Sequence, residues 1–574
     1  MARTVAIGIQ NFETLIQKNC FYIDKTMFIK EWWESNDSTT LITRPRRFGK
    51  TLNMSMLEQF FSVNYANRSD LFEGLAIWKE EEYRILQGTY PVITLSFANV
   101  KEIDYETASY RIRQLFMKEY EKHSFLLKSD VLTDAEKKYF LSVTSGLNEK
   151  DAPMVIYNLS DYLSRYYGKK VIILLDEYDT PMQEAYVHGY WDELVAFTRS
   201  MFNSMFKTNP YLERGLMTGI TRVSKESIFS DLNHLEVVTT TSDKYATAFG
   251  FTEEEVFASM EEYGLGDAKA EVKAWYDGFV FGEHADIYNP WSILKYLDTG
   301  KLGLYWANTS SNSLVGKLIR EGDRRIKLSF EALLRGETIS CEIDEQIVYN
   351  MLDGNEEAIW SLLLASGYLK VVSYKAVGEG EDEFAPMYEL ALTNREVKQM
   401  FYGMVRNWFK STGGSYNDFI DALLAGDLKA MNVYMNRITL QTFSYFDTGK
   451  GYAGNEPERF YHGFVLGLLA ELQGKYVITS NRESGFGRYD VMLEPKKPEE
   501  YPKYPAIILE FKIYDAEDEA DLKETVSVAL AQIEKKQYEA ALLAKGIPAE
   551  YIRKYGFAFE GKKVLIGEAK SHKM

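Results

Sequence analysis

The sequence predicts an α/β protein: a parallel-sheet domain, then a helical middle region, then a second α/β domain. Three observations predict it. Residues 39–61 follow the order strand, turn, helix. An apolar run at residues 171–175 passes directly into two acidic residues, as expected for a central parallel strand with both faces covered. Residues 487–542 read as two strands followed by a helix.

The composition limits the function. A chain of 574 residues is long enough for two to four domains. Its net charge of -18 gives no general attraction to nucleic acid, so any such contact must come from a local patch. Two distant cysteines without metal-ligand spacing favour a reducing compartment. No signal-peptide pattern and no membrane-length apolar run occur, so we expect a cytoplasmic protein with no membrane partner.

The turn after the first predicted strand carries a phosphate-loop pattern. Such a loop has the form G-x-x-x-x-G-K-[ST], and residues 44–51, RPRRFGKT, fit it except that Arg44 replaces the first glycine. If that position must be left-handed, Arg44 would carry about 1–2 kcal/mol of strain. The loop N–H groups and the lysine suit phosphate oxygens, and the hydroxyl suits Mg²⁺. The residues that we expect to bind ATP and its Mg²⁺ here are Arg47, Phe48, Gly49, Lys50 and Thr51.

Two further strands complete the predicted ATP site. Asp176 and Glu177 end the strand within residues 169–181, where open α/β sheets bind ligands. We expect Asp176 to hold Mg²⁺ and Glu177 to polarise the attacking water. The strand that follows ends in Thr221 and Arg222. Either could sense the γ-phosphate, or the segment could be a simple turn.

The remaining elements of this domain follow from apolar periodicity. Residues 21–24 read as a short strand and residues 90–100 as a buried one. Helices are expected at residues 27–35, 103–127, 134–146, 152–167 and 190–206.

Four segments resemble a known family. Residues 44–51, 174–181, 219–233 and 275–294 are similar to the AAA-ATPase-like family of bacterial and archaeal proteins. The resemblance implies a P-loop NTPase (AAA-like) domain using ATP and Mg²⁺, with arginine as the usual first loop residue. Members commonly carry a C-terminal PD-(D/E)XK-type nuclease domain. The aromatic block at residues 275–294 is expected to pack rather than to contact substrate.

The middle region is expected to be helical and winged-helix-like. Residues 356–401 read as helix, hairpin, helix. The wing, residues 377–384, is acidic, which favours a lid over contact with phosphates. The predicted domains are the ATPase domain at residues 1–300, this region at 301–440 and the nuclease-like domain at 441–574.

The C-terminal strands carry the restriction-endonuclease-like pattern. Asp490 lies on one strand, and Glu510 and Lys512, two residues apart, face the same side of the next. Tyr489 stands where the motif has proline. Asp490 and Glu510 would hold Mg²⁺ through hard oxygen ligands, and Lys512 would position water. The alternative is a domain that keeps the nuclease fold without its activity, in which these residues form an exposed ion pair.

Two more catalytic candidates follow from the resemblance. Glu458, on a helix predicted over residues 457–472, looks like the additional acidic residue of such nucleases. Gln532, on a helix predicted over residues 527–542, resembles the glutamine that many of them carry after the E-x-K strand.

Two function hypotheses follow. In the first, ATP binding and hydrolysis are coupled to a Mg²⁺-dependent nuclease-like domain acting on nucleic acid, which we expect to be DNA rather than RNA. In the second, a nucleotide-switched signalling or binding protein recognises nucleic acid or a partner without cleaving it. A metabolic phosphate-loop enzyme lacks any substrate motif in this sequence. The sequence is compatible with a monomer and with an oligomer. It is also compatible with an ATP site completed by an arginine from a neighbouring subunit and with one that needs no such arginine.

Overall fold

A computed structural model of the chain describes residues 3–222, 234–307, 313–321, 324–344, 352, 355–375, 386–410, 416–442, 465, 469, 472, 474–484, 487–497, 504–515, 519–560 and 563–569. It divides into two compact units. The first comprises Met1–Leu318 and Thr338–Val397, and the second comprises Ile319–Glu337 and Lys398–Met574.

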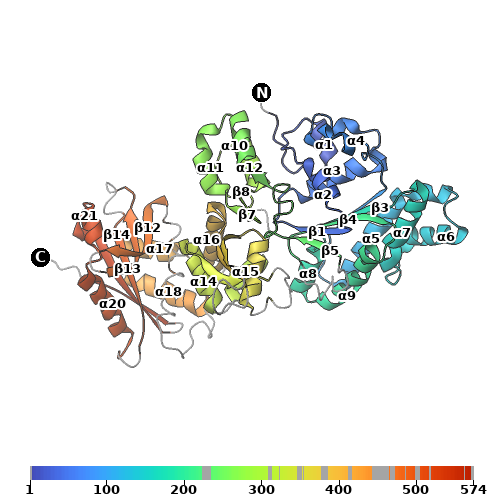
Figure 1. The fold of residues 1–574 in the computed structure, drawn as a ribbon. Helices are drawn as coiled ribbons and strands as arrows, with labels where there is room; N and C mark the ends of the chain where they lie inside the picture. Colours follow the sequence, from blue (N-terminus) through green and yellow to red (C-terminus); the bar gives the residue numbers. More distant parts are fainter. Residues whose placement is uncertain are drawn as a thin grey trace. The chain divides into compact units, whose positions relative to one another are not determined.

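A five-stranded parallel sheet organises the first unit, in the order β2-β3-β4-β1-β5 (Figure 1). Because parallel strands end at one edge, their last residues meet there: Thr43 pairs with Gly219, and Leu175 pairs with Met217. The predicted ATP-site strands β1 and β3 thus flank β4. The strand bounds are β1 Thr39–Thr43, β2 Val92–Ser96, β3 Val171–Asp176, β4 Leu212–Gly219 and β5 Leu235–Val238.

Helices cover both faces of this sheet, as the fully buried β3 requires. Figure 1 shows α1 to α3 on one face and α5, α7 and α9 on the other. On the first face, Ile172 and Leu174 share a core with Phe60 and Trp32. The helices are α1 Phe12–Gln17, α2 Met27–Glu34, α3 Lys50–Phe61, α4 Glu81–Arg84, α5 Tyr105–Lys122, α6 Asp134–Gly146, α7 Ala152–Tyr167, α8 Thr180–His188 and α9 Trp191–Phe202.

The strand predicted at residues 21–24 is wrong. This segment has no strand pairing beyond the isolated bridge between Thr4 and Cys20. Asp24 instead accepts hydrogen bonds from the backbone N–H and the hydroxyl of Thr26, the residue before α2. A carboxylate that bonds the backbone two residues on favours a turn over an extended strand.

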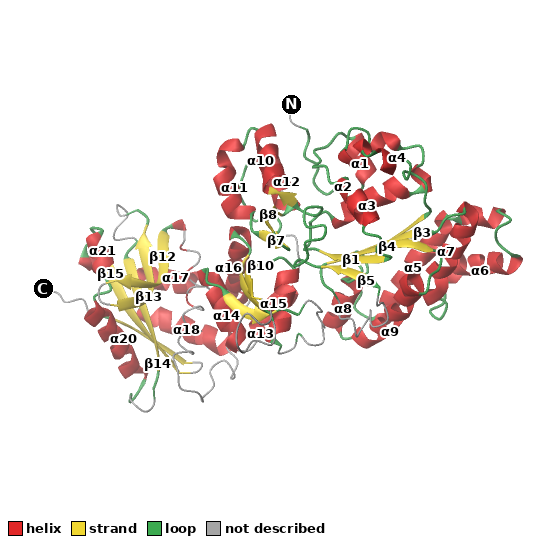
Figure 2. Cartoon of the chain, in the orientation of Figure 1, coloured by secondary structure: helices red, strands yellow, loops and turns green. Residues whose placement is uncertain are grey.

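Two small antiparallel sheets complete the first unit (Figure 2). One, of order β6-β8-β7, packs with helices that form a separate apolar core around Tyr276 and Tyr288. The other, of order β10-β11-β9, belongs to the winged-helix-like region. The bounds are β6 Phe251–Thr252, α10 Glu253–Glu262, α11 Lys269–Tyr276, β7 Phe279–Phe281, β8 His284–Tyr288, α12 Pro290–Thr299, β9 Ile339–Glu342, α15 Glu356–Ala365, β10 Leu369–Lys375 and β11 Met387–Leu392.

The predicted helix, hairpin, helix is present as α15, β10, β11 and α16. The strand β9, which the sequence analysis did not identify, pairs with β11. The acidic wing at residues 377–384 lies outside the described residues. The other helices of the middle region are α13 Ser313–Glu321, α14 Arg324–Arg335, α16 Arg395–Lys410, α17 Tyr416–Ala425 and α18 Leu428–Thr442.

A mixed five-stranded sheet forms the core of the second unit, in the order β12-β13-β14-β15-β16. Only β14 and β15 pair in parallel, and the other neighbours are antiparallel. This sheet confirms the predicted C-terminal α/β domain. The bounds are β12 Tyr476–Ser484, β13 Gly487–Pro495, β14 Ala506–Ile513, α20 Leu522–Lys536, α21 Ala540–Ala544, β15 Ile552–Glu560 and β16 Lys563–Glu568.

The helix predicted over residues 527–542 is interrupted. Gln537 ends α20 with a left-handed backbone (φ 52°), and α21 begins three residues later. This break turns Tyr538 into the core beside Met492 and Ile508. Apolar periodicity alone did not reveal the break because residues on both sides are apolar at helical spacing.

Two asparagines of α18 cover the edge strand β16. The Asn432 amide donates to the Ile566 carbonyl (2.9 Å) and accepts from the Ile566 N–H (2.8 Å). Asn436 does the same with Val564, at 2.6 and 3.0 Å. The side-chain amides thus replace a strand neighbour and protect an edge that could otherwise pair with another chain.

None of the helices in the described part of the chain combines the length and apolarity that crossing a membrane requires.

Candidate functional site

The predicted phosphate loop connects β1 to α3. Its left-handed residues are Arg47 (φ 67°) and Gly49 (φ 82°), the latter immediately before α3. Arg44 is not among the described residues with positive φ. The strain considered for Arg44 is therefore absent, and the one non-glycine residue of the loop with a left-handed backbone is Arg47.

Arg44 is a buried structural residue. Its guanidinium donates to the carbonyls of Thr43 (2.9 Å), Thr239 (2.6 Å) and Lys244 (3.3 Å), and it lies 4.5 Å from the ring centre of Phe281. Burial lowers the pKa of Arg44 to about 9. The arginine that replaces the first motif glycine thus ties the loop to the chain segment after β5.

Lys50 lies within the curl of the loop. Its ammonium donates to the carbonyls of Arg44 (2.7 Å) and Pro45 (2.9 Å), and the side chain is buried. Burial lowers the pKa of Lys50, while the charges of nearby carboxylates, chiefly Glu177 and Asp179, act in the opposite direction. The Lys50 ammonium therefore lies against the loop and near the acidic end of β3.

Asp176 and Thr51 are in direct contact. The Thr51 hydroxyl donates to Oδ2 of Asp176 (2.8 Å), and the Thr218 hydroxyl of β4 donates to Oδ1 (2.6 Å). Burial raises the pKa of Asp176. A hydroxyl and a carboxylate side by side form the hard oxygen set that suits Mg²⁺ beside a phosphate loop. The sequence analysis did not single out Thr218.

The other two acidic residues after β3 differ in their surroundings. Glu177 has a left-handed backbone (φ 51°), and its carboxylate accepts from the Thr180 hydroxyl at 3.1 Å. Asp179 is buried and accepts from the N–H groups of Ile220 and Thr221, both at 2.9 Å, and from the Thr221 hydroxyl at 3.0 Å. Asp179 thus holds the segment after β4 in place, whereas Glu177 is only half-buried.

The end of β4 lies against the loop. The Arg44 N–H donates to the Gly219 carbonyl at 3.1 Å. Thr221 is buried and engaged with Asp179, and Arg222 is half-buried beside it. Of the two candidate γ-phosphate sensors, Arg222 is therefore favoured over Thr221. Its role as the sensor stays a prediction.

The aromatic block packs on the loop. Phe48 is buried against Phe279 and Phe281, with ring centres 4.8 and 5.4 Å apart. The exposed Arg47 guanidinium lies 4.4 Å from the ring centre of Trp291. Within the block, Tyr276 and Tyr288 are fully buried, consistent with a packing role.

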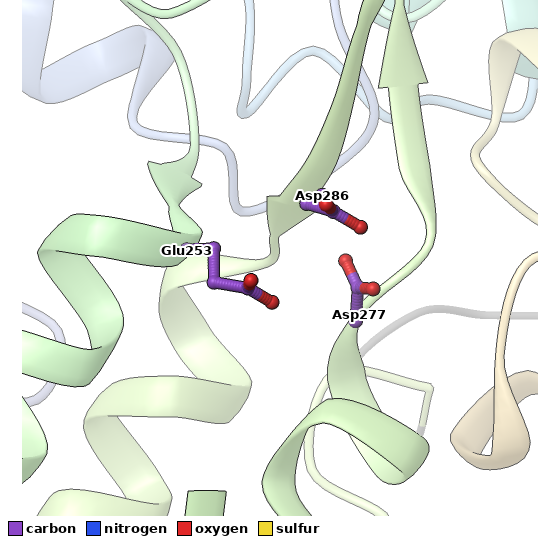
Figure 3. A group of neighbouring side chains, drawn as sticks. All are labelled: Glu253, Asp277 and Asp286. Atoms are coloured by element: carbon purple, nitrogen blue, oxygen red, sulfur yellow. The ribbon is translucent and has the colours of Figure 1, made fainter. Parts of the chain in front are cut away.

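Glu253, Asp277 and Asp286 form an acidic cluster at the start of α10, after α11 and on β8 (Figure 3). Their carboxylates point toward one another. The ammonium of Lys273 reaches all of them, contacting Glu253, Asp286 (3.2 Å) and Asp277 (3.5 Å). Burial raises the pKa of Asp277 to about 6, whereas Lys273 lowers that of Asp286. The lysine makes the cluster an ion-pair network.

In the second unit, strand pairing brings the predicted nuclease residues together. Antiparallel pairing of Val491 with Leu509 places Asp490 and Glu510 next in register. The Phe511 N–H donates to Oδ2 of Asp490 at 2.8 Å. Two carboxylates on neighbouring strands can hold a divalent cation through hard oxygens, so the donor set fits Mg²⁺.

Lys512 and Gln532 both contact Glu510. The Lys512 ammonium lies 3.7 Å from Oε1 of Glu510, whose side chain is 1 % exposed. The Gln532 amide donates to the same oxygen and to the Tyr538 hydroxyl (3.1 Å). Burial raises the pKa of Tyr538, and the charge of Glu510 adds to this shift. Tyr538 therefore joins a site to which the sequence analysis did not assign it.

Two further residues of the nuclease-like domain were considered from the sequence, Tyr489 and Glu458. Tyr489, in place of the motif proline, is buried, and its hydroxyl lies 2.6 Å from that of Thr479. This contact joins β12 to β13. Glu458 lies outside the described residues, so its role stays a prediction.

Comparisons with known proteins agree with this geometry. Residues 6–229 match the family model described as "Predicted AAA-ATPase", and residues 456–569 match that of the PD-(D/E)XK nuclease superfamily. A relative, the "Uncharacterized protein in vnfD 5'region" of Azotobacter chroococcum mcd 1, is 24% identical over 477 residues, covering 81% of this chain and 82% of that protein.

A solved structure, the Walker-type ATPase PABY2304 of Pyrococcus abyssi, matches with a TM-score of 0.33 and 14% identity, covering 66% of this chain and 95% of that one. The family assignment depends instead on the two matched models, one covering the phosphate loop, β3 and β4, the other covering Asp490, Glu510 and Lys512. Residues 6–229 thus form an AAA-ATPase-like domain, and residues 456–569 form a domain of the PD-(D/E)XK nuclease superfamily.

Proposed function

We propose that the first unit binds ATP with Mg²⁺ and hydrolyses it. The observation that carries this proposal is the direct hydrogen bond between Thr51 and Asp176 beside the loop that holds Lys50. Lys50 and the N–H groups of residues 47–49 would bind the phosphates, and Thr51 and Asp176 would hold the metal. Bound Mg²⁺ would neutralise charge on the phosphate oxygens.

The chain's own residues account for the hydrolytic step. Glu177 orients a water molecule and takes its proton as the water oxygen bonds to the γ-phosphorus. The bond from that phosphorus to the β,γ-bridging oxygen breaks, and ADP leaves with the electron pair. Asp179 is a weaker candidate for the base because two N–H groups and a hydroxyl already hold its carboxylate.

We further propose that the second unit cleaves nucleic acid, DNA rather than RNA, in a Mg²⁺-dependent reaction. Asp490 and Glu510 would hold the metal, which supplies Lewis-acid activation when bound. Lys512 would orient the attacking water, and Gln532 would fix the Glu510 carboxylate, to which it already donates. A lysine and a carboxylate on one buried strand are costly to desolvate, which favours a functional reason for keeping them.

The ATPase proposal is tested by the rate of phosphate release with Mg²⁺ and by ATP affinity. Glu177→Gln should retain ATP binding while hydrolysis falls by about 100-fold or more. ATP should then remain bound through gel filtration. Hydrolysis at the wild-type rate in Glu177→Gln would move the base to another group, and a wild-type chain that neither binds nor hydrolyses ATP would refute the proposal.

The nuclease proposal is tested on single-stranded, duplex and branched DNA and RNA with Mg²⁺ or Mn²⁺. Lys512→Ala should abolish cleavage. The exposed lysine Lys523 on α20 offers a matched control, since Lys523→Ala removes the same charge from the same domain without touching Glu510. Equal cleavage by wild type and Lys512→Ala would refute an active site at this place.

One observation favours a second function, a nucleotide-switched protein that binds nucleic acid or a partner without cutting. The net charge of -18 opposes general attraction to a phosphate backbone. This alternative predicts tight ATP binding with little turnover, and no cleavage of any substrate with either metal.

A further inference from the structure

The loop holds three arginines in three different environments. Arg44 is buried and bonded to backbone carbonyls, and Arg47 is exposed over Trp291. Arg46 is half-buried, and its guanidinium donates to a neutral acceptor, Oε1 of Gln183, at 3.2 Å. In the part of the chain that the structure describes, no carboxylate lies within ion-pair distance of Arg46. Arg44 and Arg47 have no such ion pair there either, so what distinguishes Arg46 is that it is half-buried with a single neutral side-chain acceptor.

Arg46 lies beside segments that contribute to the proposed ATP site. Gln183 lies in the first turn of α8, which begins four residues after Asp176. Arg46 and Gln183 line one cavity with Ile220 and Thr221, directly after β4. The other residues that line this cavity are Trp306, Leu314, Val315, Leu362, Ser366 and Tyr368. The guanidinium thus lies where the loop, the segment after Glu177 and the end of β4 converge.

The backbone of Arg46 is held by two other side chains. Its carbonyl accepts from the Asn289 amide (3.2 Å) and from the Trp306 indole N–H (3.0 Å). These contacts hold the middle of the loop, so the guanidinium needs little reorganisation to meet a ligand. Its charge also contributes to lowering the pKa of Lys50, as expected for two neighbouring cations.

A half-buried guanidinium with one neutral partner has donors left for an anion. It presents five N–H groups in a rigid fork that matches phosphate oxygens. In phosphoryl transfer, an arginine that stabilises the charge of the transferred group can be supplied by the same chain or by a partner. We propose that Arg46 is this arginine, positioned by Gln183, so that the site needs no arginine from a neighbouring subunit. The assignment rests on the proposed ATP hydrolysis.

The test compares steady-state ATP hydrolysis and nucleotide affinity of the full-length chain and its variants. Arg46→Ala should lower kcat by about 10³-fold and abolish binding of ADP with aluminium fluoride, a mimic of the transferred phosphoryl group. ADP affinity should stay within about threefold of wild type because the γ-phosphate is absent from ADP. Gln183→Ala should lower kcat less and leave ADP binding unchanged. Arg111→Ala, at an exposed arginine paired with Glu102, is the matched control and should behave as wild type.

A mixing experiment distinguishes an arginine of the same chain from one of a partner. Arg46→Ala keeps the rest of the ATP site, and Lys50→Ala keeps Arg46. If Arg46 serves its own site, the two variants mixed in equal amounts remain inactive. Restored hydrolysis in the mixture would overturn the same-chain assignment.

Failure of the Arg46 assignment and failure of the proposed ATP hydrolysis give different results. Wild-type kcat in Arg46→Ala, with Lys50→Ala inactive, overturns the role of Arg46 and leaves ATP hydrolysis standing. A large loss in Arg222→Ala together with wild-type kcat in Arg46→Ala would transfer the role to Arg222. A wild-type chain that does not hydrolyse ATP overturns both. If Arg46→Ala fails to fold, Arg46→Lys, which keeps the charge but loses the fork, and Gln183→Ala decide the question by the same criteria.

Discussion

The two candidate sites each combine carboxylates with a lysine, but they are assembled differently. At the ATP site, Lys50 is held by loop carbonyls, and Asp176 by two hydroxyls, one from α3 and one from β4. At the nuclease-like site, Lys512 lies beside Glu510 on the same strand. The first site depends on segments far apart in the sequence, and the second on strand alternation and one helix.

The difference shows what each site needs in order to form. A loop site exists only if distant segments hold the loop in place, as the contacts of Arg44 and Arg46 do. A strand site needs only correct register, because residues two apart share a face. Substitutions around the loop should therefore alter both stability and function, whereas those at the strand site should alter function with little effect on folding.

The largest expected effect is at Lys50. Lys50→Ala removes the cation that would contact the phosphates, and several charge-assisted hydrogen bonds contribute about 1.5–3 kcal/mol each. ATP affinity should fall by about 100-fold or more, as measured by calorimetric titration. Lys138→Ala, at an exposed lysine of α6, should bind ATP as wild type does. Unchanged affinity in Lys50→Ala would remove the loop from the ATP site.

Asp490→Asn sharpens the comparison at the strand site. The amide oxygen can still accept from the Phe511 N–H, so the fold should persist, but the charge that would hold the metal is lost. Cleavage should fall on the order of 10³-fold, since metal catalysis supplies several kcal/mol. ATP hydrolysis by the same variant should continue. Glu494→Gln, on the same strand and paired with Lys545, is the control that should cut normally.

Arg44→Gly restores the motif glycine and should nevertheless harm the protein. The carbonyls of Thr43, Thr239 and Lys244 would lose a buried donor, each at a cost of about 1–3 kcal/mol. We expect the free energy of unfolding of the first unit, measured by chemical denaturation, to drop by about 3 kcal/mol or more. A variant as stable as wild type would show that Arg44 is not the residue that secures the loop.

The smallest effect is expected at the edge of the second unit. Asn432→Ala leaves the Ile566 N–H and carbonyl without their side-chain partner, at about 1 kcal/mol. Hydrogen exchange at the Ile566 amide should accelerate while that of Phe557, in the sheet interior, stays slow. Equal protection of Ile566 in the variant and in wild type would contradict the role given to Asn432.

Much of the strand site was predictable, because alternation along an apolar strand fixes which residues share a face. Asp490, Glu510 and Lys512 meet as their spacing predicts, and Gln532 joins them from the following helix. The break at Gln537 that brings in Tyr538 was not predictable, because the apolar pattern continues through it. Glu458 lies outside the described residues.

The loop site was predictable only in outline. The motif indicates Lys50, Thr51 and the acidic end of β3, yet nothing in RPRRFGKT distinguishes its three arginines. Their environments depend on Thr239, Gln183 and Trp291, which lie up to 244 positions away along the chain. The short strand expected at residues 21–24 failed for a local reason, the turn formed by Asp24.

The central claim, two separate metal sites on one chain, is tested most directly by Mn²⁺ binding with and without a non-hydrolysable ATP analogue. We predict that Asp490→Asn loses the nucleotide-independent Mn²⁺ binding and that Lys50→Ala loses the additional Mn²⁺ that binds with nucleotide. Asp277→Asn, in the ion-pair cluster around Lys273, should lose neither. Nucleotide-independent Mn²⁺ binding that survives Asp490→Asn unchanged would contradict the account.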